Sequence, residues 1–405
     1  MAGPTSRSIL VSGAGIAGPT LAYWLLKRGF RPVLLERAPR FREGGYVIDF
    51  WGLGIDVAER MDLLPRVREV GYLNDRITFV GPNGGTRSTF GGAPLRRALG
   101  DRFVTIQRGD LAHAIYDTIE GQVETVFGDS VQAIEQRPDA VDVVFAHGPP
   151  RSFDLVIGAD GLHSGVRAAL FGDARPERYL GYYAAVFVTK GYSKRNEHAY
   201  VSYASPGRQI SRFALREDQT GFFFVFARPQ RFPEGPFSLA AQQQALVDEF
   251  DREPWIEWPE IKRHLAACDN LYFDAVSQIE LPAWSHGRAA LVGDAAYCPS
   301  LLAGEGSAFA MAGAYILAGE LQQADGDPAA FAAYERRFRP FIERKQKSAR
   351  AFASSFAPKT RLGLLFRDLV LRVGAIPAVA DHLMRRFVLD HFDLPEYARC
   401  TTDLD

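Results

Sequence analysis

The pattern of apolar and polar positions at the beginning of the chain predicts one strand–helix–strand unit. Residues 9–11 form a short apolar run, as expected for a buried parallel strand. Apolar residues then recur at helical spacing from residue 21 to residue 25, and Gly29 ends this helix. Residues 32–35 form a second apolar run and predict the next strand. Together they make a βαβ unit of about 30 residues.

The same reading extends along most of the chain. Helical spacing of apolar residues predicts a helix whenever it is sustained, and short apolar or alternating runs next to turn residues predict strands. Asp110 is expected to be the N-cap of its helix. The helices are expected at 55–64, 110–119, 164 onward, 238–252, 308–321, 329–352 and 362–387, and the strands at 76–87 (a hairpin), 131–144 (two strands), 155–157 and 289–292.

The composition changes between residues 178 and 285, where helical periodicity fades and aromatic residues accumulate in short runs. Tyr, Phe and Val are residues that favour strands, and turn signals such as residues 205–207 separate the runs. This stretch predicts an antiparallel sheet inserted between parts of the first domain. Most of its aromatic residues are expected in the core, and a minority are expected to line a pocket for a flat, apolar substrate.

The turn after the first strand carries the sequence G-x-G-x-x-G. Gly13 allows a tight turn, Gly15 lets the backbone approach a pyrophosphate, and Gly18 lets the helix pack closely on the strand. The helix N-terminus offers free N–H groups to phosphates. Glu36 ends the second strand, where its carboxylate can accept hydrogen bonds from a ribose diol. The unit predicts a dinucleotide ligand but does not distinguish FAD from NAD.

Two further stretches place an acid or a glycine directly after a buried strand. Asp160 and Gly161 follow one strand and precede a helix, and Gly293 and Asp294 end another. Gly304 and Gly306 then precede an apolar helix, whose N-terminus suits an electron-rich group.

Overall composition excludes several classes of partner. The chain has 405 residues, which predicts two domains or one large domain with insertions, and 47% of its residues are hydrophobic. The net charge of −1 gives no basis for nucleic-acid binding, because phosphate backbones require a basic surface. The three cysteines are widely spaced, so neither a disulfide framework nor a metal site is expected.

The apolar segments also bear on location. No stretch of 18 apolar residues occurs, and the first strand begins within ten residues of Met1, where a signal peptide would lie. The expectation is therefore a cytoplasmic enzyme, monomeric or homodimeric, and membrane binding is not expected.

Three motifs, in this order and at these separations, resemble those of the class A FAD-dependent monooxygenases, the family of para-hydroxybenzoate hydroxylase and the tetracycline-inactivating monooxygenases. The glycine fingerprint with Glu36 resembles the family's dinucleotide motif. Asp160-Gly161 with Ser164 and Arg167 resembles its DG motif, and Gly293-Asp294 its GD motif. The resemblance covers nearly the whole chain.

The resemblance implies an α/β fold, with a Rossmann-like FAD-binding domain, an inserted antiparallel β-sheet substrate domain and C-terminal helices. The expected FAD-binding domain comprises residues 1–75, 96–175 and 285–335. The substrate-binding domain comprises 76–95 and 176–284, and residues 336–405 form the C-terminal helical segment.

The resemblance also assigns roles to single residues. Glu36 would hold the adenosine ribose, and Asp294 the ribityl and pyrophosphate region. Arg108 and Asp49 would contact the flavin, and Arg42 is a candidate for NADPH. The full set expected to bind the cofactors is Gly13, Ala14, Gly15, Ala17, Gly18, Glu36, Arg37, Arg42, Asp49, Arg108, Val131, Asp160, Gly161, Gly293, Asp294, Pro299, Gly304, Gly306 and Ser307.

The chain departs from the family pattern around the third motif. Tyr297 stands where many members carry His, and Leu301 replaces a common proline. The usual Gly-Gln-Gly-x-Asn becomes Gly304-Glu305-Gly306-Ser307-Ala308. Glu305, if directed at the flavin, would disfavour negative charge on the reduced ring.

The implied function is a monooxygenase that consumes NAD(P)H and transfers one oxygen atom of O2 through a flavin C4a-hydroperoxide. The expected substrate is a small aromatic or polyketide-like molecule, and no catalytic side chain is named because the flavin performs the chemistry. One alternative is a Baeyer–Villiger oxidant or a reductase on the same scaffold. Another is a flavin- or ligand-binding protein without turnover.

Overall fold

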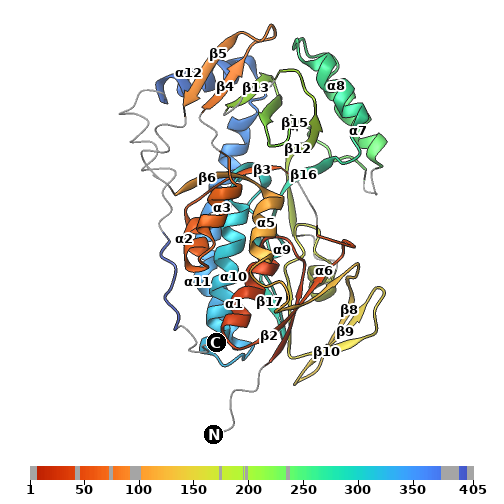
Figure 1. Ribbon diagram of the computed structural model, residues 1–405, viewed down its shortest axis with the longest axis vertical. Helices are drawn as coiled ribbons and strands as arrows, with labels where there is room; N and C mark the ends of the chain where they lie inside the picture. Colours follow the sequence, from red (N-terminus) through yellow and green to blue (C-terminus); the bar gives the residue numbers. More distant parts are fainter. Residues whose placement is uncertain are drawn as a thin grey trace.

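The computed structural model describes residues 7–41, 46–72, 76–91, 102–172, 176–194, 196, 199–233, 238–374 and 392–398. Two large sheets dominate the molecule, one in its lower part and one in its upper part as drawn in Figure 1. Strands β12 (Glu177–Lys190) and β16 (Tyr272–Ile279) of the upper sheet extend toward the lower part.

The lower sheet has six strands in the order β17-β18-β11-β1-β2-β7. Strand β1 (Ser8–Ser12) pairs in parallel with β2 (Arg31–Glu36) and β11 (Leu155–Gly158), and its apolar residues 9–11 are fully buried. Helix α1 (Ala17–Lys27) connects β1 to β2, so the predicted βαβ unit is confirmed. The remaining strands are β7 (Glu124–Phe127), β17 (Ser285–His286) and β18 (Ala289–Leu291).

Helices cover this sheet, and two of the predicted helices differ from those in the structure. Of the helix predicted at 362–387, residues 375–387 lie outside the described residues. The single helix expected at 55–64 is two helices, α2 (Leu53–Arg60) and α3 (Leu64–Val70), because Asp62 takes a left-handed conformation with φ of +56° between them. Helix α5 (Arg108–Tyr116) begins before Asp110, so the expectation that Asp110 is the N-cap is wrong; Gln107 holds that position without a side-chain cap.

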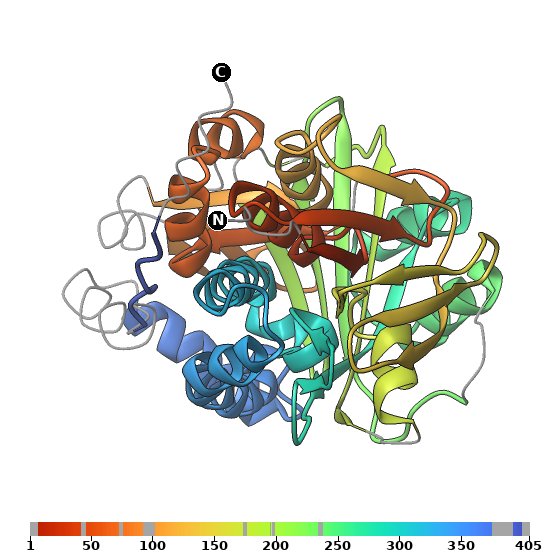
Figure 2. The ribbon, with the colours of Figure 1, turned by 90° about the horizontal axis from the view of Figure 1, so that it is seen from below.

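Two long helices form one side of the molecule. Helix α10 (Gly306–Gln323) is buried along residues 308–321, and α11 (Ala329–Phe356) packs against it, as Figure 2 shows. Helix α10 also packs against α1 and α2. It is therefore enclosed by other elements, which explains its almost continuous apolar sequence.

Shorter elements complete the lower part. Strands β8 (Val131–Gln136), β9 (Val141–Phe145) and β10 (Arg151–Phe153) form a three-stranded sheet, and β3 (Val47–Trp51) pairs with β6 (Phe103–Gln107). Helix α6 (Gly165–Phe171) is capped by Ser164, whose Oγ accepts the N–H of Arg167 at 2.9 Å. Helix α9 (Asp294–Tyr297) and the short 3₁₀ helix η1 (Leu301–Ala303) connect β18 to α10.

The upper sheet has seven strands in the order β16-β12-β15-β14-β13-β4-β5. All neighbours are antiparallel except β4 (Arg76–Val80) and β13 (Ala199–Ser205). The other members are β5 (Thr86–Gly91), β14 (Arg208–Ala214) and β15 (Gln219–Ala227). The antiparallel sheet expected from the aromatic stretch is thus present, and the predicted hairpin at 76–87 supplies its edge.

Helices lie on both sides of the upper sheet (Figure 1). On one face, α7 (Leu239–Phe250) and α8 (Trp258–Ala267) cover a core of aromatic side chains that includes Phe187, Phe222, Phe224 and Phe226. Helix α12 (Arg361–Gly374) packs against β5 and β13. Its outer side chains at residues 362, 365, 366, 369 and 370 are exposed and apolar. Among the described residues, no helix has the length and hydropathy needed to span a bilayer.

Residues 392–398 return to the lower part and dock on α10. The ring of Tyr397 is 9% exposed, and its hydroxyl donates to Glu320 Oε1 at 2.7 Å. Gly319 makes room for this ring, because a Cβ there would lie 2.2 Å from it. Tyr315 contributes a further bond from its hydroxyl to the carbonyl of Pro395 at 2.8 Å.

Candidate cofactor and substrate site

The turn between β1 and α1 is built so that only glycine fits at its first and last positions. Gly13 has φ of +110°, and a Cβ on it would lie 2.5 Å from the carbonyl oxygen of Ala159. A Cβ on Gly18 would lie 1.8 Å from the carbonyl oxygen of Gly13. These contacts match the turn and packing roles expected of the two glycines.

Gly15 has a different surrounding. A Cβ on this residue would face the Arg108 guanidinium, with 3.3 Å to Nη2. The backbone of the β1–α1 turn therefore has an arginine as its neighbour. An arginine beside bare backbone amide groups is an arrangement that suits an anionic group such as a pyrophosphate.

The DG loop, which begins at Asp160-Gly161, lies directly beside this turn. A Cβ on Gly13 would approach within 2.8 Å of the Asp160 Cα, and Gly161 has φ of +83°. The Asp160 carboxylate accepts the Ser164 hydroxyl and, at 3.1 Å, the N–H of Val166, so it fixes the beginning of α6. Val131 lies next to this helix start, with its carbonyl 3.7 Å from the Cβ position of Gly165.

The GD loop, residues 293–294, also lies beside the turn between β1 and α1. Gly293 has φ of +66°, and a Cβ there would lie 3.0 Å from the Cβ of Ala17 in α1. A Cβ on Gly306, the first residue of α10, would lie 3.6 Å from Asp294 Oδ1. The structure thus brings residues 13–18, 160–161, 293–294 and 306 into one cradle, although 280 positions separate the first from the third.

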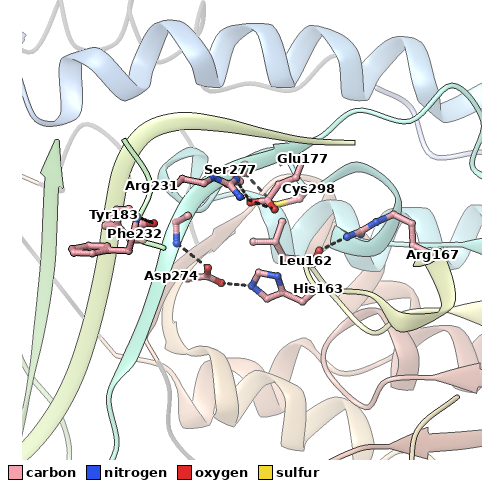
Figure 3. Close-up of polar contacts among 11 residues, drawn as sticks. Leu162, His163, Arg167, Glu177, Tyr183, Arg231, Phe232, Asp274, Ser277 and Cys298 are labelled. Atoms are coloured by element: carbon pink, nitrogen blue, oxygen red, sulfur yellow. Dashed lines mark hydrogen bonds and ion pairs between the residues drawn. The ribbon is translucent and has the colours of Figure 1, made fainter. Parts of the chain in front are cut away.

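Arg167 connects the DG and GD loops. Its guanidinium donates to the carbonyl of Ala295 in α9 at 3.0 Å and to that of Leu162 at 2.6 Å. Figure 3 shows the Arg167 side chain directed toward Leu162 of the DG loop. Arg167 therefore holds the loops together.

Glu36 and its neighbour Arg37 have different environments. Glu36 Oε2 accepts the N–H of Ala14 and Oε1 that of Ala38, each at 2.8 Å, so the carboxylate is fixed at the edge of the glycine turn. Arg37 is exposed to solvent. Arg42 and the paired glycines 44–45 lie outside the described residues.

Three aspartates of the expected site share an electrostatic feature. Burial raises the pKa of Asp49, Asp160 and Asp294 above the ordinary aspartate value. The positive charge of Arg108 opposes this shift at Asp294, and hydrogen bonds from Thr105 and Tyr200 oppose it at Asp49. Thr105 Oγ1 lies 2.7 Å from Asp49 Oδ1.

The remaining expected residues lie between the GD loop and α10. Pro299 is buried, and its carbonyl accepts the Gln278 amide at 2.8 Å. Gly304 has φ of +72° and faces Trp51, with 3.9 Å from its Cβ position to the indole ring, and Ser307 belongs to the first turn of α10.

Ser300, between the GD motif and α10, has a backbone conformation that the sequence did not predict. It has φ of +111°, although it is not a glycine, and its side chain accepts the N–H of Leu302 at 3.3 Å. Such a conformation costs about 1–3 kcal/mol and is retained when the surroundings enforce it. The adjoining Pro299 and Leu301 are the only sequence signal of an unusual loop at this place.

The Glu305 side chain forms an ion pair with Lys345. Its Oε1 atom lies 2.8 Å from Nζ of Lys345 in α11, and the two side chains are 17% and 18% exposed. Any effect of Glu305 on the charge of a reduced flavin is therefore opposed by the positive charge of Lys345.

The upper sheet presents its second face to the GD loop. Leu302 of η1 packs with Tyr182, Ala184 and Val225, all on the face opposite α7 and α8. Strand register places a cross-strand row on this face, because alternate side chains point to the same side. The row runs through Ser88, Phe79, Ser202, Ser211, Phe223, Val186 and Tyr272.

One end of this row reaches the cradle. The ring of Tyr272 lies 5.6 Å from that of Tyr46, and burial raises the pKa of Tyr46 to about 12. Arg108 and Asp294 both act electrostatically on Tyr46. The row therefore begins beside the charged residues of the cradle.

The other end carries a chain of buried polar groups beneath α12. Arg367 Nη1 donates to Gln209 Oε1 at 3.2 Å, the Gln209 amide donates to Ser211 Oγ at 3.2 Å, and Ser211 shares a hydrogen bond with Ser202 at 2.8 Å. The Arg367 guanidinium also lies 4.2 Å from the centroid of the Phe79 ring. This face thus combines aromatic side chains with a hydrogen-bonded polar edge.

Comparison with known proteins also indicates an FAD-binding fold. The model of the FAD binding domain family matches residues 6–349. A flavin-dependent monooxygenase from Legionella longbeachae serogroup 1 is 35% identical over 363 residues, which cover 87% of this chain and 90% of the relative. A second flavin-dependent monooxygenase, from an unknown prokaryotic organism, is 35% identical over 344 residues, covering 85% and 88%.

Solved structures show the same similarity in three dimensions. The crystal structure of tetracycline destructase Tet(51) has a TM-score of 0.81 and 32% identity, over 96% of this chain and all of that one. Klebsiella pneumoniae HpxO, complexed with FAD and uric acid, has a TM-score of 0.76 at 24% identity, over 94% and 97% of the chains, and so shares the fold.

Proposed function

Since the chain belongs to the class A FAD-dependent monooxygenases, we propose that it consumes NAD(P)H and inserts one oxygen atom of O2 into an aromatic or polyketide-like small molecule. Bound FAD would supply the redox chemistry, which comprises acceptance of a hydride from NAD(P)H and activation of O2. The protein has to position the substrate and exclude water.

The convergence of the three loops is the observation that carries this proposal. The residues present fit FAD, because the glycine turn lacks side chains where a pyrophosphate has to approach, and Arg108 lies beside Gly15. Glu36 is fixed at the turn, where its carboxylate retains capacity to accept ribose hydroxyl groups. Asp294, at the beginning of α9, is assigned to the ribityl and pyrophosphate region.

The rest of the expected cofactor set is proposed on the same ground. Backbone contacts are assigned to Ala14, Ala17, Gly161, Gly304 and Ser307, and Arg108 and Asp49 are assigned to the flavin ring. Arg42 is retained as a candidate for NADPH on resemblance alone. The tetracycline destructase and HpxO structures support a planar, polar-edged substrate as the class to test.

The cofactor assignment is tested by reconstituting purified variants with FAD. We expect Gly15→Val to lose FAD, because the added side chain fills the space beside Arg108. Glu36→Ala and Asp294→Ala are expected to weaken FAD binding at least tenfold, since each removes a ligand group. Absorbance near 450 nm after gel filtration measures bound FAD. Arg40→Ala, at an exposed position outside the expected cofactor set, is the control for Glu36→Ala. Full FAD content in Asp294→Ala and Glu36→Ala together would contradict the site.

The reaction is tested with the FAD-loaded enzyme and a library of phenolic and polyketide compounds, tetracycline among them. We expect one or more compounds to stimulate NADPH oxidation, with equal O2 uptake and a product heavier by one oxygen atom. Ring expansion or lactone formation would favour a Baeyer–Villiger oxidant. Substrate reduction without O2 uptake would favour a reductase, and FAD binding without any NAD(P)H consumption would favour a binding protein.

A further inference from the structure

A pair of opposite charges lies at the beginning of α10. Glu305 immediately precedes the helix, and Lys345 lies in the middle of α11, 40 positions later. Their Oε1 and Nζ atoms are 2.8 Å apart, and neither side chain is more than 18% exposed. The packing of α11 against α10 thus places an ammonium group beside the helix start.

The Glu305 side chain turns to this lysine and not to its own helix. It makes no capping hydrogen bond to α10, although its carbonyl accepts the N–H of Phe309 at 3.1 Å. The first N–H groups of a helix carry positive partial charge and bind electron-rich groups when no cap occupies them. The beginning of α10 therefore stays available to a ligand in the cradle.

The surroundings make the pair electrostatically effective. Lys345 Nζ lies 5.7 Å from the ring centroids of Phe309 and Phe341. Charges enclosed in this way are screened less than charges in water, so an unpaired Glu305 carboxylate would oppose the positive field of the helix start. Lys345 compensates that carboxylate.

A second carboxylate, that of Asp294, also lies near the helix start. The Cβ position of Gly306 is 3.6 Å from Asp294 Oδ1, and Arg108 lowers the pKa of Asp294 against the effect of burial. Each carboxylate near the first turn of α10 thus has a cation of its own, Arg108 for Asp294 and Lys345 for Glu305. This balance matters because two-electron reduction of FAD, with uptake of one proton, adds one negative charge to the flavin.

We infer that Lys345 is a positioning residue that compensates Glu305 and thereby sets the reduction potential of the bound flavin. The inference rests on the proposed function only in requiring FAD in the cradle. Lys345 does not touch the reacting atoms in this assignment. It acts through Glu305 and the N-terminus of α10.

The test measures the two-electron midpoint potential of FAD in the wild type, Lys345→Met, Glu305→Gln and the double variant, by slow reduction with a reference dye. We expect Lys345→Met to lower the ratio of affinities for reduced and oxidised FAD about tenfold, a shift of about −30 mV. Glu305→Gln is expected to shift the potential upward. The double variant should return close to the wild type, and Lys345→Arg, which keeps the charge, should differ little.

Unchanged potentials in both Lys345→Met and Glu305→Gln, with FAD fully bound, would overturn this role and leave the proposed function intact. A double variant as low as Lys345→Met would also overturn it, because the lysine would then act without Glu305. If Lys345→Met does not fold, Glu305→Gln decides alone, and a downward or absent shift rejects the inference. A wild-type protein that binds no FAD would overturn both proposals.

Discussion

Three aspartates with raised pKa values, two in the cradle and Asp49 outside it, lower the free energy of unfolding at neutral pH. Asp49, Asp160 and Asp294 are half-buried, and burial disfavours their charged forms. In the unfolded chain an aspartate ionises near pH 4. As pH rises above that value, the unfolded state loses protons first, so the free energy of unfolding falls until the folded carboxyl groups ionise as well.

Replacing one of these carboxyls with an amide should therefore stabilise the cofactor-free protein. We expect Asp294→Asn to have a higher free energy of unfolding than the wild type at pH 7, with the difference shrinking as pH approaches about 4. Each unit by which folding raises the pKa corresponds to about 1.4 kcal/mol. Urea unfolding of FAD-free protein across this pH range measures the effect.

The matched control is an exposed aspartate with the opposite shift. Hydrogen bonding to Lys262 lowers the pKa of Asp251, so Asp251→Asn is expected to reduce stability slightly at neutral pH. An Asp294→Asn variant that is less stable than the wild type at pH 7 would contradict the assignment of burial as the dominant cause.

At the scale of elements, a buried ion pair fixes α8 on the upper sheet. Arg212 of β14 meets Glu257, the residue before α8, through two contacts of 2.7 and 3.2 Å. Tyr192 donates its hydroxyl to the same carboxylate at 2.6 Å. The two charged side chains are 5% and 6% exposed. A buried ion pair of this kind adds little net stability, because the cost of removing both charges from water offsets their attraction.

Breaking that pair on one side should be costly. We expect Glu257→Ala to lower the free energy of unfolding by about 3–5 kcal/mol, because it leaves the Arg212 guanidinium buried without its partner. The double variant Arg212→Leu/Glu257→Leu should recover much of the loss. Chemical denaturation of both variants measures this.

The exposed pair of Lys262 and Asp251 serves as the comparison for Glu257→Ala. Its side chains are 40% and 51% exposed, and breaking it should cost far less than breaking the buried pair, because solvent screens the attraction between its charges. Equal losses at the exposed and the buried pair would show that burial does not control the cost at Glu257.

At the scale of the whole molecule, contacts between the lower part and the upper sheet close the site. Figure 3 shows His163, from the DG loop, facing Asp274 of β16, with 3.0 Å between Nε2 and Oδ2. The hydrogen bond to Asp274 raises the pKa of His163; Glu177 acts in the same direction, and burial and Arg167 oppose it. Glu177 of β12 is itself paired with Arg231, as the same view shows.

The His163 contact should make stability depend on pH. Because the folded pKa is raised, its contribution is fully present below the ordinary histidine value, about 6.5, and is lost as pH rises through the folded pKa. We expect His163→Gln to lower the urea midpoint at pH 6 but not at pH 9. The effect should stay below about 1 kcal/mol, since the imidazole is 64% exposed.

Asp274→Asn is expected to produce the same loss at pH 6, and the double variant no further loss. Additive losses in the double variant would show that the two side chains stabilise the protein independently.

Local pattern was sufficient for much of this protein. The spacing of Gly13, Gly15 and Gly18 between two apolar runs determined the βαβ unit, because strand and helix periodicities depend on neighbouring residues alone. Each of the three motifs also follows a buried strand, and parallel strands of one sheet end at the same edge. The order of motifs therefore predicted the family and the cradle.

The local pattern could not predict contacts between distant segments. The break at Asp62, the strained Ser300 and the pairing of Glu305 with Lys345 depend on which residues fold against them. The sequence did not show which face of each aromatic strand is buried, because this depends on α7 and α8, which cover one side of the upper sheet. Periodicity determined the elements of this protein and the positions of its glycine turns. Charge pairing and the faces that the aromatic strands present arise from residues far apart in the chain, and only the tertiary structure decided them.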